Sequence, residues 1–282
     1  MPELKTNHPL ANLTRFRTGG MAEFFFAPAS AKELRAFLRT NAIRPITIIG
    51  LGSNILIRDG GIPGLVIHTG AMSKTIEIKD GFIDANAGTE LSRIANFSME
   101  NGIGGFEFMA GIPGTAAGGL MTNAGCFGGQ ISDVLHSVTG LSLDGQQIEL
   151  SATKCQLGYR TSNISRDIII TGLRFKATKH KTSADIKKQI EEIIKKKTES
   201  QPTDTRTAGS TFKNPSDGVP AWRKIKNAFP DGLSVGGARI SEKHANFIIA
   251  DDDCRSADIE TLIEKIQAAT GLELEIKIIG ER

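Results

Sequence analysis

Hydrophobic positions with two different periods alternate along the chain and predict a mixture of helices and strands. Near the start, Ser30 and Glu33 have the spacing of a capping box, and apolar residues follow at helical intervals. The β-branched run 46–49 comes next and predicts a buried strand. The first part of the chain therefore predicts a small unit of one helix and one strand.

The middle of the chain, from about residue 65 to residue 179, carries short alternating patterns that are typical of strands. The segments 75–88 and 140–150 each contain an Asp-Gly pair, which favours the tight turn of a hairpin. One helical pattern, 90–100, interrupts the strands and ends at an Asn-Gly pair. This zone predicts a sheet of hairpins with one helix.

The last third begins with a long helical pattern over residues 181–197, which places Ile186, Ile190, Ile193 and Ile194 on one face. The lysines 195–197 predict a solvated helix end, since cations favour the carbonyl end of a helix. The polar stretch 198–210 predicts a domain boundary. Further elements are expected as a helix at 220–229, a strand at 245–249, a helix at 256–269 and a strand at 272–279.

Composition narrows the class of protein. The 282 residues carry a net charge of +3 and 23% charged side chains, which describes a globular chain of about two domains. No apolar run reaches the roughly 18 residues of a membrane span, and the N-terminus has no apolar leader, so the sequence predicts a cytoplasmic protein. Three scattered cysteines and five unpaired histidines favour neither disulfides nor a metal site. One Trp and one Tyr offer few stacking surfaces, which disfavours nucleic-acid binding.

Glycine is concentrated in one segment, since ten of the 28 residues from Gly102 to Gly129 are glycine. Such clustering indicates loops in which the main chain needs positive φ or approaches a ligand closely. A Walker loop is excluded because no glycine precedes Lys-Ser or Lys-Thr, and Ile55 replaces the third glycine of a dinucleotide fingerprint beginning at Gly50. The sequence GLGSN at 50–54 still follows a predicted strand, where its amides can bind a pyrophosphate, although a plain turn explains it equally well.

Polar groups stand out at three further places: the segment 159–162 with Arg160, the segment 209–215 with Ser210, and Glu275. Each has an ordinary structural explanation, as a surface ion pair, a turn cap or the solvent side of a strand. Together with two candidate phosphate loops they supply a cation, a hydroxyl and a carboxyl, the groups needed to manage charge beside a reducible substrate.

With these motifs the chain resembles the UDP-N-acetylenolpyruvoylglucosamine reductases, also called UDP-N-acetylmuramate dehydrogenases, over nearly its whole length. The motifs that carry the resemblance are RFRTGG at 15–20, GLGSNILIRDGG at 50–61, GIPGTAAGGLMTNAG at 111–125, YRTS at 159–162, GSTFKNP at 209–215, SEKHANF at 241–247 and LELEIKIIG at 272–280. The short distance from Arg160 to Ser210 resembles the branch that lacks an extra tyrosine-bearing loop. The family commonly has other residues at Lys277, Phe127 and Ala250.

The resemblance implies an α+β protein with a two-subdomain FAD-binding fold of the vanillyl-alcohol-oxidase (PCMH) type and a C-terminal α/β substrate-binding domain. The subdomains are expected at 1–65, joined by the final strand 276–282, and at 66–180, and the substrate domain at 181–275. It further implies Arg160, Ser210 and Glu275 as catalytic residues. The implied FAD contacts are Gly50, Leu51, Gly52, Ser53, Asn54, Gly111, Ile112, Pro113, Gly114, Thr115, Gly118, Gly119, Asn123 and Gly125, and the implied substrate contacts are Tyr159, Lys213, Asn214 and His244.

The activity implied by the resemblance is NADPH-dependent, FAD-mediated reduction of UDP-N-acetylglucosamine enolpyruvate to UDP-N-acetylmuramate, in peptidoglycan precursor synthesis. No nucleic acid, membrane or obligate protein partner is expected. Two other classes stay open: a related FAD oxidase, in which Cys126 forms a flavin thioether, and a non-catalytic binder of nucleotide sugars or flavin. The presence of all three catalytic positions disfavours the binder.

Overall fold

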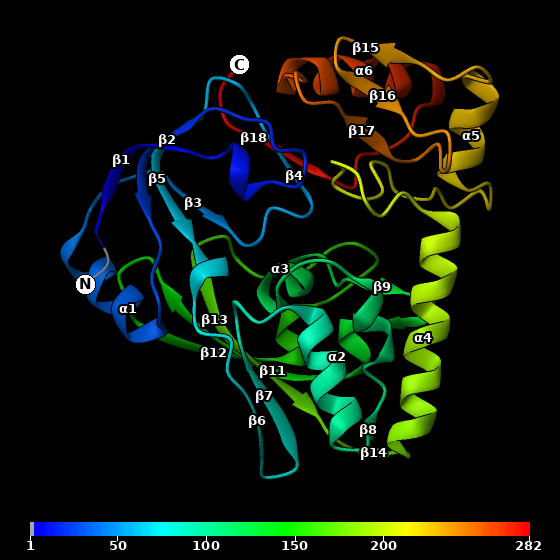
Figure 1. The fold of residues 1–282 in the computed structure, drawn as a ribbon. Helices are drawn as coiled ribbons and strands as arrows, with labels where there is room; N and C mark the ends of the chain where they lie inside the picture. Colours follow the sequence, from blue (N-terminus) through cyan, green and yellow to red (C-terminus); the bar gives the residue numbers. More distant parts are fainter. Residues whose placement is uncertain (1–2) are drawn as a thin grey trace. The chain divides into compact units, whose positions relative to one another are not determined.

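The computed structural model describes residues 3–282, which divide into two compact units (Figure 1). Unit 1 is built from Phe26–Leu51 and Ile67–Lys197. Unit 2 combines Lys5–Phe25, Gly52–Val66 and Thr198–Arg282. Because the chain passes between the units several times, each unit is assembled from segments that are distant in sequence.

An antiparallel five-stranded sheet forms the centre of unit 1, in the order β12-β11-β13-β7-β6. Its strands are β6 (Ile76–Lys79), β7 (Phe82–Asn86), β11 (Leu135–Ser142), β12 (Gln147–Ser151) and β13 (Ile168–Lys176). Asp80 and Gly81 both have positive φ, at 52° and 79°, as a tight hairpin turn between β6 and β7 requires. Both hairpins expected from the Asp-Gly pairs are therefore confirmed.

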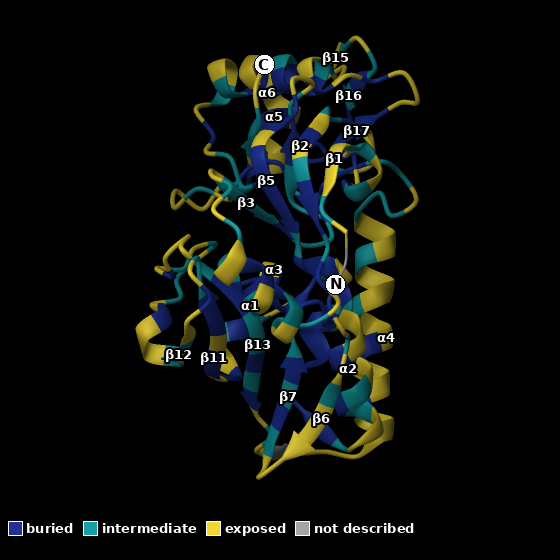
Figure 2. Ribbon diagram, turned by 90° about the vertical axis from the view of Figure 1, so that its left-hand side faces the viewer, coloured by how far each residue is buried: buried dark blue, intermediate teal, exposed yellow. Residues whose placement is uncertain are grey.

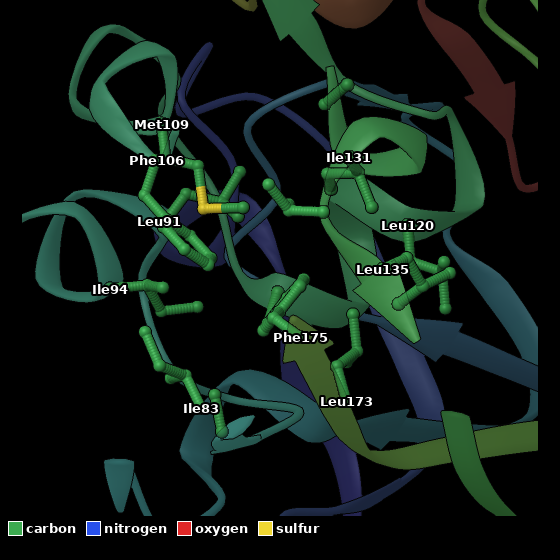
Figure 3. Packing of buried hydrophobic residues seen from close by; sticks show 14 of the residues in the cluster. Ile83, Leu91, Ile94, Phe106, Met109, Leu120, Ile131, Leu135, Leu173 and Phe175 are labelled. Atoms are coloured by element: carbon green, nitrogen blue, oxygen red, sulfur yellow. The ribbon is translucent and has the colours of Figure 1, made fainter. Parts of the chain in front are cut away.

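The helices of unit 1 are α1 (Ala31–Thr40), α2 (Leu91–Glu100), α3 (Ala116–Met121) and α4 (Ser183–Ser200). As the sequence predicts, the Ser30 hydroxyl caps α1 by accepting a hydrogen bond from the Glu33 amide at 3.2 Å. Side chains from the sheet and from α2, α3 and α4 share one hydrophobic core. Figure 3 shows part of it, with Leu91 and Phe175 among the labelled residues.

The long helix α4 differs from its expected form in its length. It continues to Ser200, past the predicted end. Its buried residues are Ile186 and Ile190, whereas Ile194, at the edge of the apolar face, is 47% exposed. Because the helix has about 3.6 residues per turn, Ile193 lies closer than Ile194 to the line of the buried residues Ile186 and Ile190. Figure 2 shows the largely exposed surface of this helix.

Short elements complete unit 1. They are β3 (Ile46–Ile49), η2 (Thr69–Ala71), β8 (Ile103–Gly104), η3 (Glu107–Gly111), β9 (Gly125–Cys126), β10 (Gly129–Gln130), η4 (Ile131–Asp133), η5 (Ala152–Cys155) and β14 (Lys179–His180). The strand expected at 46–49 is confirmed as β3.

Unit 2 combines the beginning and the end of the chain. Its first strands are β1 (Lys5–Pro9), β2 (Met21–Phe26), β4 (Ile55–Ile57) and β5 (Ile62–His68), with η1 (Ala11–Leu13) between β1 and β2. The final strand, β18 (Lys277–Ile279), pairs in parallel with β4, placing Lys277 opposite Ile55. The regular final strand is shorter than the predicted 272–279, because residues 273–275 bond to an irregular segment instead.

The rest of unit 2 is an α/β layer. It contains α5 (Ala221–Ala228), β15 (Ser234–Val235), β16 (Ala238–Ile240), β17 (Ile248–Ala250) and α6 (Ser256–Thr270), around a second hydrophobic core. The strand predicted at 245–249 begins later, at Ile248, because residues 241–247 form a hydrogen-bonded loop. Among residues 3–282, no helix is long and apolar enough to cross a membrane.

Candidate active site

The two glycine loops meet inside unit 1. A Cβ placed on Gly50 would lie 3.0 Å from the Thr115 hydroxyl, and one placed on Gly118 would lie 3.3 Å from the same atom. Thr115 is the N-cap residue of α3, and its hydroxyl accepts a hydrogen bond from the Gly118 amide at 3.1 Å. Gly114, with φ 128°, turns the chain into this helix. One glycine from each loop therefore lies beside the Thr115 hydroxyl.

The GLGSN loop continues into unit 2, where its second glycine is confined. Gly52 has φ +60°, and a Cβ on it would lie 1.9 Å from the Leu13 carbonyl oxygen. The Gly52 carbonyl accepts a hydrogen bond from the Arg15 amide at 3.2 Å. Asn54 donates through its side-chain amide to the Glu275 carbonyl at 3.3 Å. The loop thus has a fixed path, and one of its predicted cofactor residues is tied to the backbone of Glu275.

Not every glycine of the second loop is explained by a ligand. A Cβ on Gly119 would lie 2.8 Å from Ile131 and 2.9 Å from Leu91, so core packing alone requires glycine there. By contrast, the positions at Gly50 and Gly118 are restricted by a polar hydroxyl rather than by the core. Without side chains of their own, Gly50 and Gly118 fit the close approach of a phosphate-bearing cofactor to the main chain. No group of three or more His, Cys, Asp or Glu side chains within residues 3–282 could hold a metal ion.

Arg160 lies at the tip of a tight turn in unit 1. Gly158 and Thr161 bond to each other's backbone at 3.1 and 3.3 Å, and Arg160 between them has φ 55°. Its guanidinium donates from Nη2 to the Gly125 carbonyl at 3.2 Å. The exposed Tyr159 ring lies beside the same guanidinium, with its centroid 5.4 Å from Cζ.

Asn123 is hydrogen-bonded to this turn. Its buried side chain donates to the Gly158 carbonyl at 3.1 Å and accepts from the Ser132 amide at 2.9 Å. The structure therefore connects Asn123, which the resemblance assigns to the flavin, with the turn that presents Arg160.

Lys197, which the sequence predicts to lie at a solvated helix end, has a specific contact in unit 1. Its ammonium donates to the Gly111 carbonyl at 2.6 Å, joining α4 to the start of the second glycine loop. The sequence did not predict this contact, because three consecutive lysines give no indication of which one faces the protein. The half-buried Lys197 differs from its exposed neighbours Lys195 and Lys196 only through the helix phase.

Cys126 lies beside the same loop. Its thiol donates to the Phe108 carbonyl at 3.1 Å, and burial raises its pKa to about 11. A nucleophilic cysteine needs a thiolate, which this environment disfavours. The surroundings of Cys126 therefore do not favour a flavin thioether.

Ser210 and Glu275 lie on adjacent extended segments of unit 2. Ser210 bridges to Phe247 on one side, while the Thr211 carbonyl accepts from the Glu275 amide at 2.8 Å on the other. Lys213 continues this pairing through its amide, which donates to the Glu273 carbonyl at 2.9 Å. The segment 210–213 is therefore the middle member of three short extended pieces.

The two acids of the terminal LELE sequence differ in their environment. The Glu273 side chain is 79% exposed and forms an ion pair with Lys213 at 3.3 Å. Glu275 is partly buried. The partly buried acid is the one that the resemblance assigns to catalysis.

The remaining predicted substrate residues have structural contacts in unit 2. The Asn214 side-chain carbonyl accepts from the Ala221 amide at 3.0 Å, at the start of α5. The His244 ring packs edge-on against Phe247, with centroids 4.9 Å apart. Burial lowers the pKa of His244, which favours the neutral ring. Both residues border the segment that carries Ser210.

Comparison with known proteins agrees with the geometry. Residues 201–280 match the C-terminal domain of UDP-N-acetylenolpyruvoylglucosamine reductase, and residues 22–151 match an FAD binding domain. A relative of that name from Parvibaculum lavamentivorans is 40% identical over 287 residues, covering 99% of this chain and 92% of the relative. One from Rickettsia akari is 38% identical and covers 99% and 96%.

The chain belongs to the UDP-N-acetylenolpyruvoylglucosamine reductase family. The crystal structure of the reductase from Thermus caldophilus is similar throughout, with a TM-score of 0.88 at 30% identity, covering 99% of this chain and 100% of that one. The α+β fold with an FAD-binding part and a C-terminal reductase domain is thereby confirmed. The protein is a flavin-dependent oxidoreductase of peptidoglycan precursor synthesis, in a family that uses FAD and NADPH.

Proposed function

We propose that this protein reduces UDP-N-acetylglucosamine enolpyruvate to UDP-N-acetylmuramate with NADPH as the electron source. Family membership and the FAD-binding domain support the reaction class. The observation that carries the residue assignment is the 2.8 Å hydrogen bond from the Glu275 amide to the Thr211 carbonyl. Through it, a hydroxyl and a carboxyl occupy neighbouring segments of unit 2.

The chemistry that FAD supplies when bound is acceptance of a hydride from NADPH and its delivery from N5 to the methylene carbon of the enolpyruvyl ether. The segments proposed to hold it are the loops at Gly50–Asn54 and Gly111–Gly119, where glycine allows a ligand to approach the main chain closely. Lys197 fixes the second loop through the Gly111 carbonyl.

Hydride addition leaves negative charge on the carbon that bears the ether oxygen, conjugated with the substrate carboxylate. We assign to Arg160 the contact with that carboxylate, and to Glu275, if it is protonated, a hydrogen bond that stabilises its enolate form. Donors that are already in place act on charge that develops in the transition state, and one such donor is typically worth about 3 kcal/mol. The hydrogen bond from Arg160 to Gly125 and the tight turn beneath it restrain this cation in advance.

We assign the proton to Ser210. Its hydroxyl donates to the carbanionic carbon, which forms the new C–H bond and sets its configuration, and the resulting alkoxide recovers a proton from solvent. A serine hydroxyl is a weak acid, so this transfer depends on the strong basicity of the carbanion.

Two half-reactions measured on the purified holoenzyme test the proposal. Under anaerobic conditions, NADPH should bleach the oxidised flavin absorbance, and UDP-N-acetylglucosamine enolpyruvate should restore it. Bleaching without recovery would mean that another compound is the acceptor. Protein that cannot bind FAD would refute the proposal at its first step.

The Ser210→Ala variant tests the proton donor. Flavin reduction by NADPH should stay within about twofold of the parent, while flavin reoxidation by the enolpyruvyl substrate should fall by at least about 100-fold, because general acids typically contribute 10²–10⁴-fold. Ser216→Ala is the matched control. Ser216 is exposed and lies six positions after Ser210, so its loss should leave both half-reactions unchanged. Unimpaired reoxidation in Ser210→Ala would remove Ser210 from the acid role.

A further inference from the structure

The side chain of Asn246 holds the backbone of the segment that carries Ser210. Asn246 is 4% exposed and lies in the 241–247 loop of unit 2. Its Oδ1 accepts from the Phe212 amide at 2.9 Å, and its Nδ2 donates to the Phe212 carbonyl at 2.8 Å. One side chain therefore satisfies both backbone groups of a single residue, two positions after Ser210.

The backbone of Asn246 adds a third bond. Its carbonyl accepts from the Thr211 amide at 2.8 Å, and the next residue, Phe247, bridges to Ser210. The 241–247 loop is too irregular to form a strand, so Asn246 makes the backbone hydrogen bonds that a neighbouring strand would otherwise make to Thr211 and Phe212. Phe212 is 1% exposed, so water cannot easily replace these bonds if they are lost.

The loop that presents Asn246 is itself closed by hydrogen bonds. The Ser241 amide donates to the Phe247 carbonyl at 2.8 Å, and the Phe247 amide donates to the His244 carbonyl at 2.9 Å. The Asn246 amide donates to Nδ1 of His244 at 3.3 Å. A rigid loop on one side and the segment 273–275 on the other hold the Ser210 segment between them.

We propose that Asn246 is a positioning residue for the reductase reaction, which sets the place of the Ser210 hydroxyl by clamping Phe212. The inference rests on the proposed role of Ser210 as proton donor. Asn246 touches neither reacting atom, so it acts only through the segment 210–212. Asparagine is suited to this position because its amide offers one donor and one acceptor in one plane, matching the N–H and C=O of the clamped residue.

Displacement of an acid by about 1 Å lowers a rate by as much as 10²-fold. Asn246→Ala should therefore slow flavin reoxidation by the enolpyruvyl substrate by about 10- to 100-fold, and flavin reduction by NADPH by less than about twofold. Asn246→Asp is the second variant, since it keeps the size and the acceptor but replaces the donor to the Phe212 carbonyl with an oxygen. It should show the same selective loss, without a cavity.

Ser256→Ala is the matched control for a merely structural loss. Ser256 is fully buried in unit 2 and donates to the Ile57 carbonyl at 2.5 Å, so its removal also breaks a buried bond to the backbone. The thermal midpoint should fall in this control as in Asn246→Ala, but flavin reoxidation should not change selectively. Equal losses of both half-reactions in the Asn246 variants would overturn the inference.

A double-mutant cycle with Ser210→Ala separates positioning from other effects. If Asn246 acts through Ser210, adding Asn246→Ala to Ser210→Ala should slow single-turnover reoxidation no further, because interacting residues are not additive. A full multiplicative loss in the double variant would overturn the inference while leaving the role of Ser210 intact. Unimpaired reoxidation in Ser210→Ala alone would instead refute the proposed proton donor.

Discussion

The close approach of Gly52 to Leu13 gives a sharp test of how the cofactor loop is built. In Gly52→Ala, two separate costs apply. The backbone has φ +60°, a conformation that costs an L-residue about 1–2 kcal/mol. The new Cβ would also lie 1.9 Å from the Leu13 carbonyl oxygen, a backbone atom that cannot rotate away. Forcing such an overpacked contact adds about 1–3 kcal/mol, so the total expected loss is about 2–5 kcal/mol.

Gly81→Ala is the matched control. Gly81 has φ +79° in the turn between β6 and β7, but a Cβ on it would meet nothing within 4 Å. It should therefore show only the backbone cost of about 1–2 kcal/mol. At roughly 2–4 °C per kcal/mol for a large domain, the midpoint of thermal unfolding should fall by about 2–8 °C in Gly81→Ala and by clearly more in Gly52→Ala.

Two assays distinguish the variants. Thermal unfolding of the FAD-free protein gives the difference in stability, and fluorescence titration with FAD gives the affinity of the loop for its cofactor. Gly52→Ala should weaken FAD binding at least about tenfold, since the loop must shift to relieve the contact between the new Cβ and the Leu13 carbonyl. Gly81→Ala should bind FAD with the affinity of the parent. Equal thermal midpoints and equal FAD affinities in the two variants would refute the reasoning.

Two further predictions concern side chains. Lys197→Met should weaken FAD binding about three- to tenfold, because it removes a hydrogen bond to the Gly111 carbonyl worth about 1 kcal/mol, while Lys195→Met should not; FAD titration of both variants checks this. Hydrogen bonds from Arg58 hold the pKa of Glu260 below its ordinary value of 4.5 despite its burial. The carboxylate therefore stabilises the fold above about pH 4.5 and loses this effect as the pH falls through the folded-state pKa. Glu260→Gln should accordingly be less stable than the parent in urea at pH 7, and the difference should shrink steadily in acid; a gap independent of pH would contradict this.

Local signals in the sequence were sufficient where neighbours along the chain decide the structure. The Asp80-Gly81 turn and the Ser30 cap form as predicted, because turn geometry and capping depend on residues within a few positions. The strand at 46–49 was equally clear from its β-branched run. Motif order was specific enough to indicate the family, which the full-length relatives confirm.

Local sequence patterns did not predict the structure correctly where hydrogen bonds to distant segments determine it. The final strand is regular only at Lys277–Ile279, because Glu273 and Glu275 bond to residues 211–213 instead of continuing the pairing. Such pairings depend on chain segments more than 50 residues apart, which no local periodicity records.

The sequence alone therefore determined the hairpins, the capped helix and the glycine-rich loops, since backbone preference and side-chain period are properties of short stretches. Only the tertiary structure decided which polar groups work together. It tied Asn246 to Phe212, Lys197 to Gly111 and Asn123 to Gly158. The physical reason is that a buried backbone N–H or C=O must find a partner, and the fold, rather than proximity in sequence, brings that partner within hydrogen-bond distance.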